Sequence, residues 1–252
     1  MGMKVDRRGF LVKGSFFVLG SLLGVNGLST AFASNPRIAL LIDDIGRTRQ
    51  GAKQFMDLGI PMTFAVLPHL PYSYDSALEI HGEGHEVMLH QPMEPLNASL
   101  DPGPGALYVK DKPEKIVTIL DENISSLPFT SGVNNHMGSR FTERREKMKE
   151  ALTVIKNNDL FFIDSLTSSH SIGYETARRL RLVAGYRNIF LDHYPKESYV
   201  LSQLHKLKTY ARAYGHAIGI GHPYPETLRA LRYFLEGFAR SGISLVHISE
   251  IL

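Results

Sequence analysis

The chain has 252 residues, with 28 Lys and Arg against 25 Asp and Glu, and it contains neither Cys nor Trp. A composition that is 43% hydrophobic and 21% charged is typical of a folded globular protein with one large or two small domains. The lack of Cys excludes disulfides, Cys-ligated metals and a thiol nucleophile.

The first 33 residues have the features of a secretory leader. Basic residues, including Arg7 and Arg8, precede an uncharged run over residues 14–33 that ends in Ala-Phe-Ala. A basic start, an apolar middle and a small-residue cleavage site define such leaders, and the Arg-Arg-Gly-Phe-Leu string resembles the twin-arginine type. We expect cleavage after Ala33, an exported protein of the periplasm or cell envelope, and no stable membrane insertion after cleavage. The alternative is an uncleaved anchor, but glycines and polar residues make this run a poor membrane-spanning helix.

The excess of basic residues belongs to this leader. Residues 1–33 hold four basic residues and one acidic residue, which leaves 24 of each in residues 34–252 and no net charge. No Lys- or Arg-rich stripe remains there, so we expect no nucleic-acid partner.

From residue 34 on, short apolar runs alternate with longer segments of helical periodicity. We expect strands at residues 38–42, 62–67, 86–89, 132–134, 160–163, 188–191, 217–220 and 243–248. We expect helices at residues 48–58, 73–81, 113–127, 142–157, 172–182, 199–214 and 225–241, and Gly stop signals follow three of them.

This alternation predicts an α/β fold with one domain over residues 34–252, in which outer helices cover a parallel sheet. We expect a closed or nearly closed β/α barrel rather than an open doubly wound sheet, because no Gly-rich phosphate turn follows any strand. The Pro-rich loop over residues 91–112 is expected to form a rim or lid of the binding cleft.

Polar residues follow most of the expected strands, and in a β/α barrel these positions carry the chemistry. They are Asp43-Asp44, His69, His90, Asn134-Asn135-His136, Asp164-Ser165, Asp192-His193 and His222. Imidazole and carboxylate without thiolate suit Zn, Mn, Fe, Co or Ni, and a catalytic divalent metal commonly takes three such ligands.

The adjacent carboxylates Asp43 and Asp44 are the sharpest feature of the sequence. They repel each other and are costly to desolvate, and a cation bound by one relieves that cost and leaves the other as a base. The alternative is that one of them caps the helix that follows.

Five motifs resemble the divergent branch of the polysaccharide deacetylase family. They are Leu-Ile-Asp-Asp-Ile-Gly (41–46), Gly-His-Glu-Val-Met-Leu-His-Gln-Pro-Met-Glu-Pro (84–95), Asn-Asn-His-Met-Gly-Ser-Arg (134–140), Phe-Phe-Ile-Asp-Ser (161–165) and Ile-Gly-Ile-Gly-His-Pro (218–223). The resemblance implies a distorted parallel barrel with seven or eight β/α units and metal-assisted removal of acetyl groups from N-acetylated sugars.

The resemblance also implies roles for residues of this chain. Asp43 matches the general base, Asp44 and His90 match metal ligands, and His222 matches the general acid. Glu94 stands where the parent family has a second metal histidine. Either Glu94 binds the metal or His136 supplies the missing imidazole. We favour His136, because side chains at the ends of parallel strands converge.

Three further residues have expected supporting roles. Asp164 is expected to orient His222 or another imidazole of the site. Asn135 is a candidate donor to the developing oxyanion. Arg140 is a candidate for binding an anionic group of the substrate.

Three functions remain open at this point. The first is an exported metal-dependent hydrolase, with Zn as the expected metal, that removes acetyl groups from a cell-envelope glycan. The second is a glycan- or partner-binding protein on the same barrel, motivated by the substitution at Glu94. The third is a glycosidase that uses Asp43 or Asp44 with Glu94 or Asp164 as its carboxylate pair.

Overall fold

Short strands rich in Ile, Val and Leu build one parallel sheet in a computed structural model that describes residues 35–252. Within these residues the strands are β1 (Arg37–Ile45), β2 (Thr63–Val66), β3 (Glu86–Met93), β4 (Thr130–Met137), β5 (Phe161–Asp164), β6 (Ala184–Tyr186), β7 (Ile189–Phe190), β8 (His216–Gly221) and β9 (Ser244–Val246). The α-helices are α1 (Gln50–Met56), α2 (Ser73–Gly82), α3 (Pro113–Ser125), α4 (Arg145–Asn157), α5 (Gly173–Arg179), α6 (Glu197–Tyr214) and α7 (Pro225–Leu235). Two 3₁₀ turns, Phe238–Ser241 and Ile248–Ile251, flank β9.

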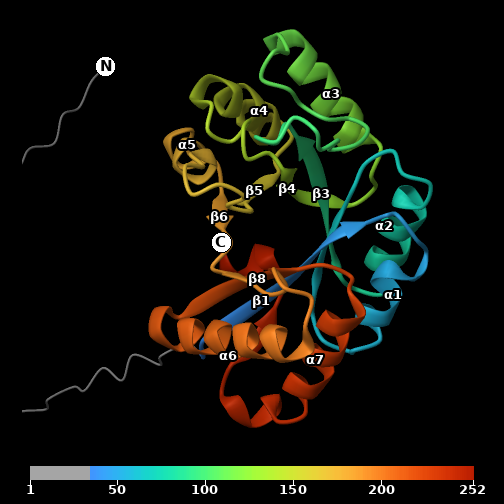
Figure 1. Cartoon of the computed structure of the whole chain (residues 1–252), viewed down its shortest axis with the longest axis vertical. Coiled ribbons are helices and arrows are strands. Elements are labelled where there is room, and N and C mark those ends of the chain that lie inside the picture. The colour runs from blue at the N-terminus through green and yellow to red at the C-terminus, as the bar shows by residue number, and fades with distance from the viewer. Residues whose placement is uncertain (1–34) are drawn as a thin grey trace, which may run out of the picture. The chain divides into compact units, whose positions relative to one another are not determined.

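The sheet is an incomplete barrel whose strand order is β6-β5-β4-β3-β2-β1-β8-β7, with β9 pairing the start of β1 (Figure 1). Its two end strands, β6 and β7, are consecutive in the chain and are joined by Arg187 and Asn188. The Arg187 N–H donates to the Asp164 carbonyl of β5, and the Asn188 N–H donates to the Ile218 carbonyl of β8. The chain therefore changes its hydrogen-bonding partner from one end of the sheet to the other at these two residues. The expected distorted β/α barrel in a single domain is confirmed.

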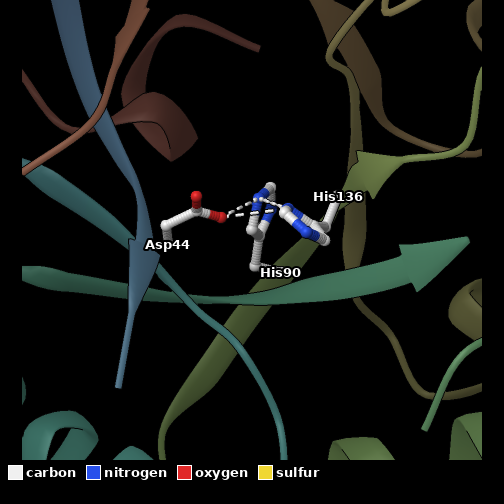
Figure 2. A group of neighbouring side chains, drawn as sticks. All are labelled: Asp44, His90 and His136. Atoms are coloured by element: carbon white, nitrogen blue, oxygen red, sulfur yellow. Dashed lines mark hydrogen bonds and ion pairs between the residues drawn. The ribbon is translucent and has the colours of Figure 1, made fainter. Parts of the chain in front are cut away.

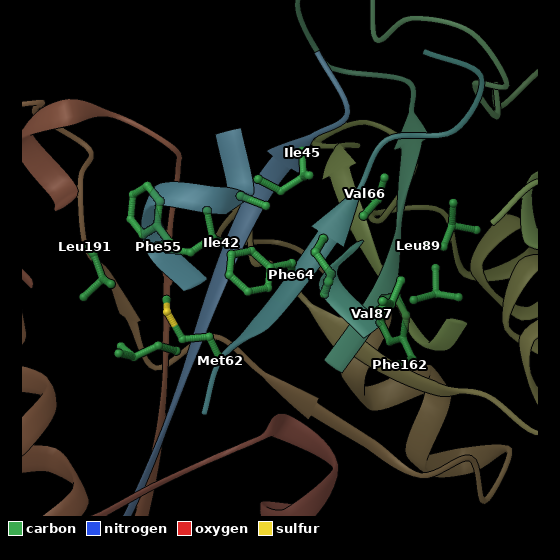
Figure 3. Close-up of a cluster of buried hydrophobic side chains, with 14 of the residues drawn as sticks. Ile42, Ile45, Phe55, Met62, Phe64, Val66, Val87, Leu89, Phe162 and Leu191 are labelled. Carbon is green, nitrogen blue, oxygen red and sulfur yellow. The ribbon is translucent and has the colours of Figure 1, made fainter. Parts of the chain in front are cut away.

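Alternating side chains of each strand divide the core into two parts. On β1, Ile38 and Leu40 belong to a large cluster that includes residues of the surrounding helices. Ala39 and Leu41 belong to a second cluster, formed with residues of β2, β3, β5 and β8, that fills the barrel interior. Figure 3 shows part of the larger cluster, in which Phe64 of β2 is fully buried. Successive strand residues point to opposite faces, so both faces of this sheet are apolar along most of its length.

Each expected strand and helix corresponds to an element of the structure, and the differences lie at boundaries. The expected helix at 225–241 ends at Leu235, and a separate 3₁₀ turn begins at Phe238. Gly237 lies between them and is a poor helix former. The sequence analysis missed β6, because three residues with one Gly carry too weak a pattern for a strand.

None of the helices described in residues 35–252 combines the length and apolar character needed to cross a bilayer. The expected leader over residues 1–33 lies outside the described residues.

Replacing Phe64 by Ala tests the importance of the core between sheet and helices. The ring is fully buried, and removing it leaves a cavity that the surroundings fill only in part. We expect Phe64→Ala to lower the free energy of unfolding by about 3–5 kcal/mol, measured by urea denaturation. Tyr233→Ala on α7 is the control, because that side chain is 60% exposed. An equal loss in both variants would contradict this account of the core.

Candidate active site

The candidate site is the polar upper layer of the barrel interior. On β1, Leu41 faces the interior, and Asp43 is the next residue with the same orientation. On β3, Met88 faces the interior in the same way, and His90 follows it. The apolar interior positions thus give way to polar ones where the strands approach their carboxyl ends, and His222 lies directly after β8.

Asp44 reaches the same site only because β1 is irregular there. Consecutive residues of a regular strand point to opposite faces, so Asp43 and Asp44 cannot both face the interior of an undistorted strand. The register of β1 against β2 shifts between Ile42 and Ile45, and Asp44 has a left-handed backbone with φ of 61°. This conformation costs a non-Gly residue about 1–3 kcal/mol. The local strain brings two adjacent carboxylates to one site.

Asp44, His90 and His136 form a compact cluster of possible metal ligands (Figure 2). Asp44 Oδ1 lies 2.9 Å from His136 Nδ1 and 3.3 Å from His90 Nε2. The two ring nitrogens are 3.1 Å apart. The three residues come from the adjacent strands β3 and β4 and from β1, which lies two strands away from β3.

Asn134 fixes the ring of His90 in this cluster. Its Nδ2 donates to Asp43 Oδ1 at 2.9 Å, so its own Oδ1 faces His90 Nδ1 at 2.8 Å. An amide oxygen accepts hydrogen bonds, and the His90 nitrogen that faces it therefore carries the proton. In neutral His90 the lone pair then lies on Nε2 and points at Asp44 and His136.

Burial and neighbouring charges shift the pKa values of the carboxylates and histidines of this site. Burial raises the pKa of Asp43, although His90 and His222 act in the opposite direction. Burial also opposes ionisation of Asp44, but the imidazoles of His136 and His90 outweigh it and hold the pKa of Asp44 well below its usual range. Burial lowers the pKa of His90, but the charges of Asp43 and Asp44 raise it by more than burial lowers it. The pKa of His90 is therefore above its ordinary value. The carboxylates thus favour positive charge on the His90 ring.

A divalent metal ion fits this cluster. Ligand atoms about 2.0–2.1 Å from a cation, at tetrahedral or right angles, lie about 2.9–3.4 Å from one another. The measured separations of 2.9, 3.1 and 3.3 Å fall in this range. Asp44 Oδ1 is buried and has no hydrogen-bond partner among the described residues. One carboxylate and two imidazoles are a common donor set for zinc.

His222 lies on the other side of the same cavity and is held by Asp192. The Asp192 Oδ1 is 2.9 Å from His222 Nδ1, while Oδ2 accepts hydrogen bonds from the His222 N–H and the Thr227 hydroxyl. Burial lowers the pKa of His222, but the hydrogen bond and charge of Asp192 outweigh it and raise the pKa to about 9. His222 is therefore an imidazolium at neutral pH.

A cavity of about 390 Å³ joins these groups. Its wall comes from β1, β3, β4, β7, β8 and the segments that follow β5, β6, β7 and β8. The lining residues are Asp43, His90, Asn135, His136, Met137, Ser165, Leu166, Thr167, Arg187, Phe190, His193, Ile220 and His222. This volume lies in the range of small-molecule binding sites.

Glu94 does not join the cluster of possible ligands. Its Oε2 accepts the Val109 N–H at 2.7 Å, and its Oε1 lies 3.5 Å from Arg140 Nη1. Glu94 thereby ties the long loop after β3 to the turn after β4. Arg140 is half exposed in this ion pair and is not part of the cavity wall.

Asp164 and Asn135 have hydrogen-bond partners other than the ones expected from the sequence. The Asp164 carboxylate accepts hydrogen bonds from the Leu166 N–H, the Ser171 hydroxyl and the Tyr174 N–H, and it orders the loop after β5 rather than His222. Asn135 lines the cavity, but its Nδ2 faces the Met137 carbonyl and Thr167 Oγ1. The first of these contacts is 2.8 Å and the second is long, at 3.4 Å, so a role of Asn135 toward an oxyanion stays a prediction.

Sequence reasoning missed two residues of the site. Asp192 directly follows the expected strand at 188–191 and thus carries the same signal as the polar residues at the other strand ends. Arg187 precedes that strand, so a search restricted to the carboxyl ends of strands passes over it.

The fold is that of the polysaccharide deacetylase class of β/α barrels. Residues 40–252 match the family described as divergent polysaccharide deacetylase, and the chain belongs to this family.

Similar proteins support this assignment. The chain is 30% identical over 217 residues to the uncharacterized protein YibQ of Escherichia coli K12, covering 86% of this chain and 67% of YibQ. The solved structure of ATU2773 from Agrobacterium tumefaciens C58 has a TM-score of 0.82 at 24% identity, covering 86% of this chain and 89% of that one. A mutant of BA3943, a CE4 family pseudoenzyme of Bacillus anthracis, has a TM-score of 0.52 at 13% identity, covering 86% and 68% of the two chains. The two solved structures share the fold.

Replacing Asp192 by Asn tests the electrostatic support of His222. The amide keeps the shape but removes the charge that favours the imidazolium. We expect the pKa of His222, measured by NMR titration, to fall from about 9 toward its ordinary value of 6.5. Asp75→Asn on α2 is the control, because Asp75 is an exposed carboxylate in an ion pair with Arg49. An unchanged pKa in Asp192→Asn would show that another group holds the proton on His222.

Proposed function

We propose that this protein is a zinc-dependent hydrolase that removes acetyl groups from an N-acetylated polysaccharide of the cell envelope. The observation that carries the proposal is the cluster of Asp44, His90 and His136, with Asp43 beside it and His222 across the same cavity. Membership of the divergent polysaccharide deacetylase family supports the substrate class and the reaction.

Asp44 Oδ1, His90 Nε2 and His136 Nδ1 are the atoms that would hold the metal. When bound, a divalent cation lowers the pKa of a coordinated water and polarises a carbonyl group. Asn134 keeps the lone pair of His90 directed at the cluster through its hydrogen bond to Nδ1. Such outer hydrogen bonds fix the tautomer and the ring orientation of a ligating histidine.

Asp43 and His222 divide the proton transfers of amide hydrolysis between them. Asp43 Oδ2 lies 3.7 Å from His90 Nε2, beside the ligand cluster, and is placed to take a proton from the attacking water. His222, an imidazolium below about pH 9, is placed to give its proton to the departing sugar amine. As the pH rises through about 9, His222 loses this proton and with it the ability to act as an acid.

Aromatic side chains around His222 support a sugar as the substrate. The ring of Tyr224 stacks on His222 with centroids 5.4 Å apart and is 40% exposed. On the other side, Phe190 packs against His222, and the exposed Tyr194 continues this aromatic surface through His193. Exposed tyrosines next to a polar cavity offer flat apolar faces to a pyranose ring.

Export to the cell envelope is part of the proposal. The basic start, apolar run and Ala-Phe-Ala end of residues 1–33 are the supporting features. A polysaccharide of the envelope is the substrate that such a location makes available.

Metal binding by ligand variants separates His136 from Glu94. We expect the purified protein to bind one equivalent of zinc, and His136→Asn to weaken this binding by more than about 100-fold, since a lost ligand costs more than a lost outer hydrogen bond. Glu94→Gln is the matched control and should retain zinc, because Glu94 contacts Val109 and Arg140 rather than the cluster. Zinc binding by the two variants is measured as metal content after dialysis and by competition with a chelator. Loss of zinc in Glu94→Gln but not in His136→Asn would overturn this ligand set.

Replacing Asp43 by Asn tests the base. We expect acetate release from N-acetylglucosamine oligosaccharides to fall about 10²–10⁴-fold while zinc content stays unchanged. The amide still accepts the hydrogen bond from Asn134, so the local structure is kept. Unchanged acetate release would refute the role of Asp43. Release of reducing ends without acetate would favour a glycosidase, and glycan binding with zinc but without any release would favour a binding protein.

A further inference from the structure

Arg187 occupies a distinctive place in the barrel. It lies between β6 and β7, the two end strands of the sheet, and its side chain forms part of the cavity wall. The proposed hydrolysis of an acetyl group assigns no role to this residue.

The guanidinium of Arg187 is held rigidly by the loop after β5. Its Nε donates to the Ser165 carbonyl at 2.7 Å, and its Nη2 donates to the Leu166 carbonyl at 2.8 Å. Leu166 adopts a left-handed backbone with φ of 48°, and strain of this kind is common where a site needs a fixed geometry. The guanidinium also lies over the ring of Phe190, 4.7 Å from its centroid.

This arginine has no ion-pair partner among residues 35–252. Asp43 and Asp164 act on it only through space, and neither forms an ion pair or hydrogen bond with the guanidinium in the part of the chain that the structure describes. Burial lowers the pKa of Arg187 against the effect of these two carboxylates. A guanidinium has five N–H donors, and two of them serve backbone carbonyls here. Three donors and a positive charge therefore remain for a ligand in the cavity.

We propose that Arg187 binds a carboxylate carried by the substrate, so that the protein acts on an acidic N-acetylated glycan. This inference rests on the proposed function, because it names the class of glycan that enters the same cavity. The planar guanidinium matches a carboxylate through two parallel hydrogen bonds, which an ammonium group cannot reproduce. Fixing the guanidinium in advance by two backbone carbonyls reduces the entropy lost when the ligand binds.

The test compares matched pairs of glycans on Arg187 variants. One pair is an N-acetylated disaccharide with a lactyl ether carboxylate and the same compound with that group reduced to an alcohol. The second pair carries a uronic acid and its reduced form, which distinguishes the two sources of the carboxylate. Binding is measured by calorimetry on the zinc-loaded protein in the Asp43→Asn background, so that turnover does not consume the ligand.

We expect Arg187→Gln to weaken binding of at least one carboxylate glycan by about 10- to 100-fold and to change binding of its reduced form by less than twofold. Arg187→Lys keeps the charge but not the two parallel donors, and should recover only part of the loss. Arg212→Gln is the matched control, because Arg212 of α6 also donates to a backbone carbonyl, that of Ser241, but is not part of the cavity wall.

An equal loss for the acidic and the reduced glycan, or no loss for either, overturns the assignment of Arg187. Failure of the carboxylate glycans to bind better than their reduced forms overturns it as well. Acetate release from the reduced glycans by the protein with Asp43 intact would then still support the proposed hydrolase. Conversely, Arg187-dependent binding of a carboxylate glycan without acetate release would support carboxylate binding by Arg187 and contradict the proposed hydrolase activity. If circular dichroism shows that Arg187→Gln is unfolded, Arg187→Lys replaces it in the test. Binding of the carboxylate glycan by wild type and by Arg187→Lys then decides whether the assignment of Arg187 holds.

Discussion

The site depends on one local constraint, the placement of two adjacent carboxylates inside a barrel. A regular strand directs Asp43 and Asp44 to opposite faces, and the irregular end of β1 directs both to the interior. Two such groups in a buried site are stable only near positive charge. The imidazoles of His90 and His136 meet Asp44, and a divalent cation at the same point would satisfy all three.

Hydrogen bonds hold the proposed catalytic groups in two networks, one on each wall-forming segment. Asn134 connects Asp43 with His90, so the proposed base and the proposed ligand are fixed by the same amide. Asp192 holds His222 across the cavity through the ring and the backbone N–H. These hydrogen bonds fix Asp43, His90 and His222 in place, whereas Asp44 Oδ1 and His136 Nε2 have no hydrogen-bond partner among the described residues.

The sequence predicted the fold well because its signals are local. Apolar runs of strand length alternating with helical segments follow from the pattern of residues alone, and a parallel sheet with outer helices is the arrangement that buries them. The same reasoning located Asp43, His90, His136 and His222, since strand ends can be read from the chain. It missed β6, whose three residues are held by neighbours rather than by their own pattern.

The sequence by itself determined the architecture, the absence of thiol ligands and the residue types at the strand ends. Only the tertiary structure decided which of these side chains meet. His136 rather than Glu94 joins Asp44 and His90, Asp192 rather than Asp164 holds His222, and Arg187 reaches the cavity from a break in the sheet. Glu94 and Asp164 are already bonded to nearby loops. This competition for hydrogen-bond partners depends on distances between segments far apart in sequence, and no local pattern records it.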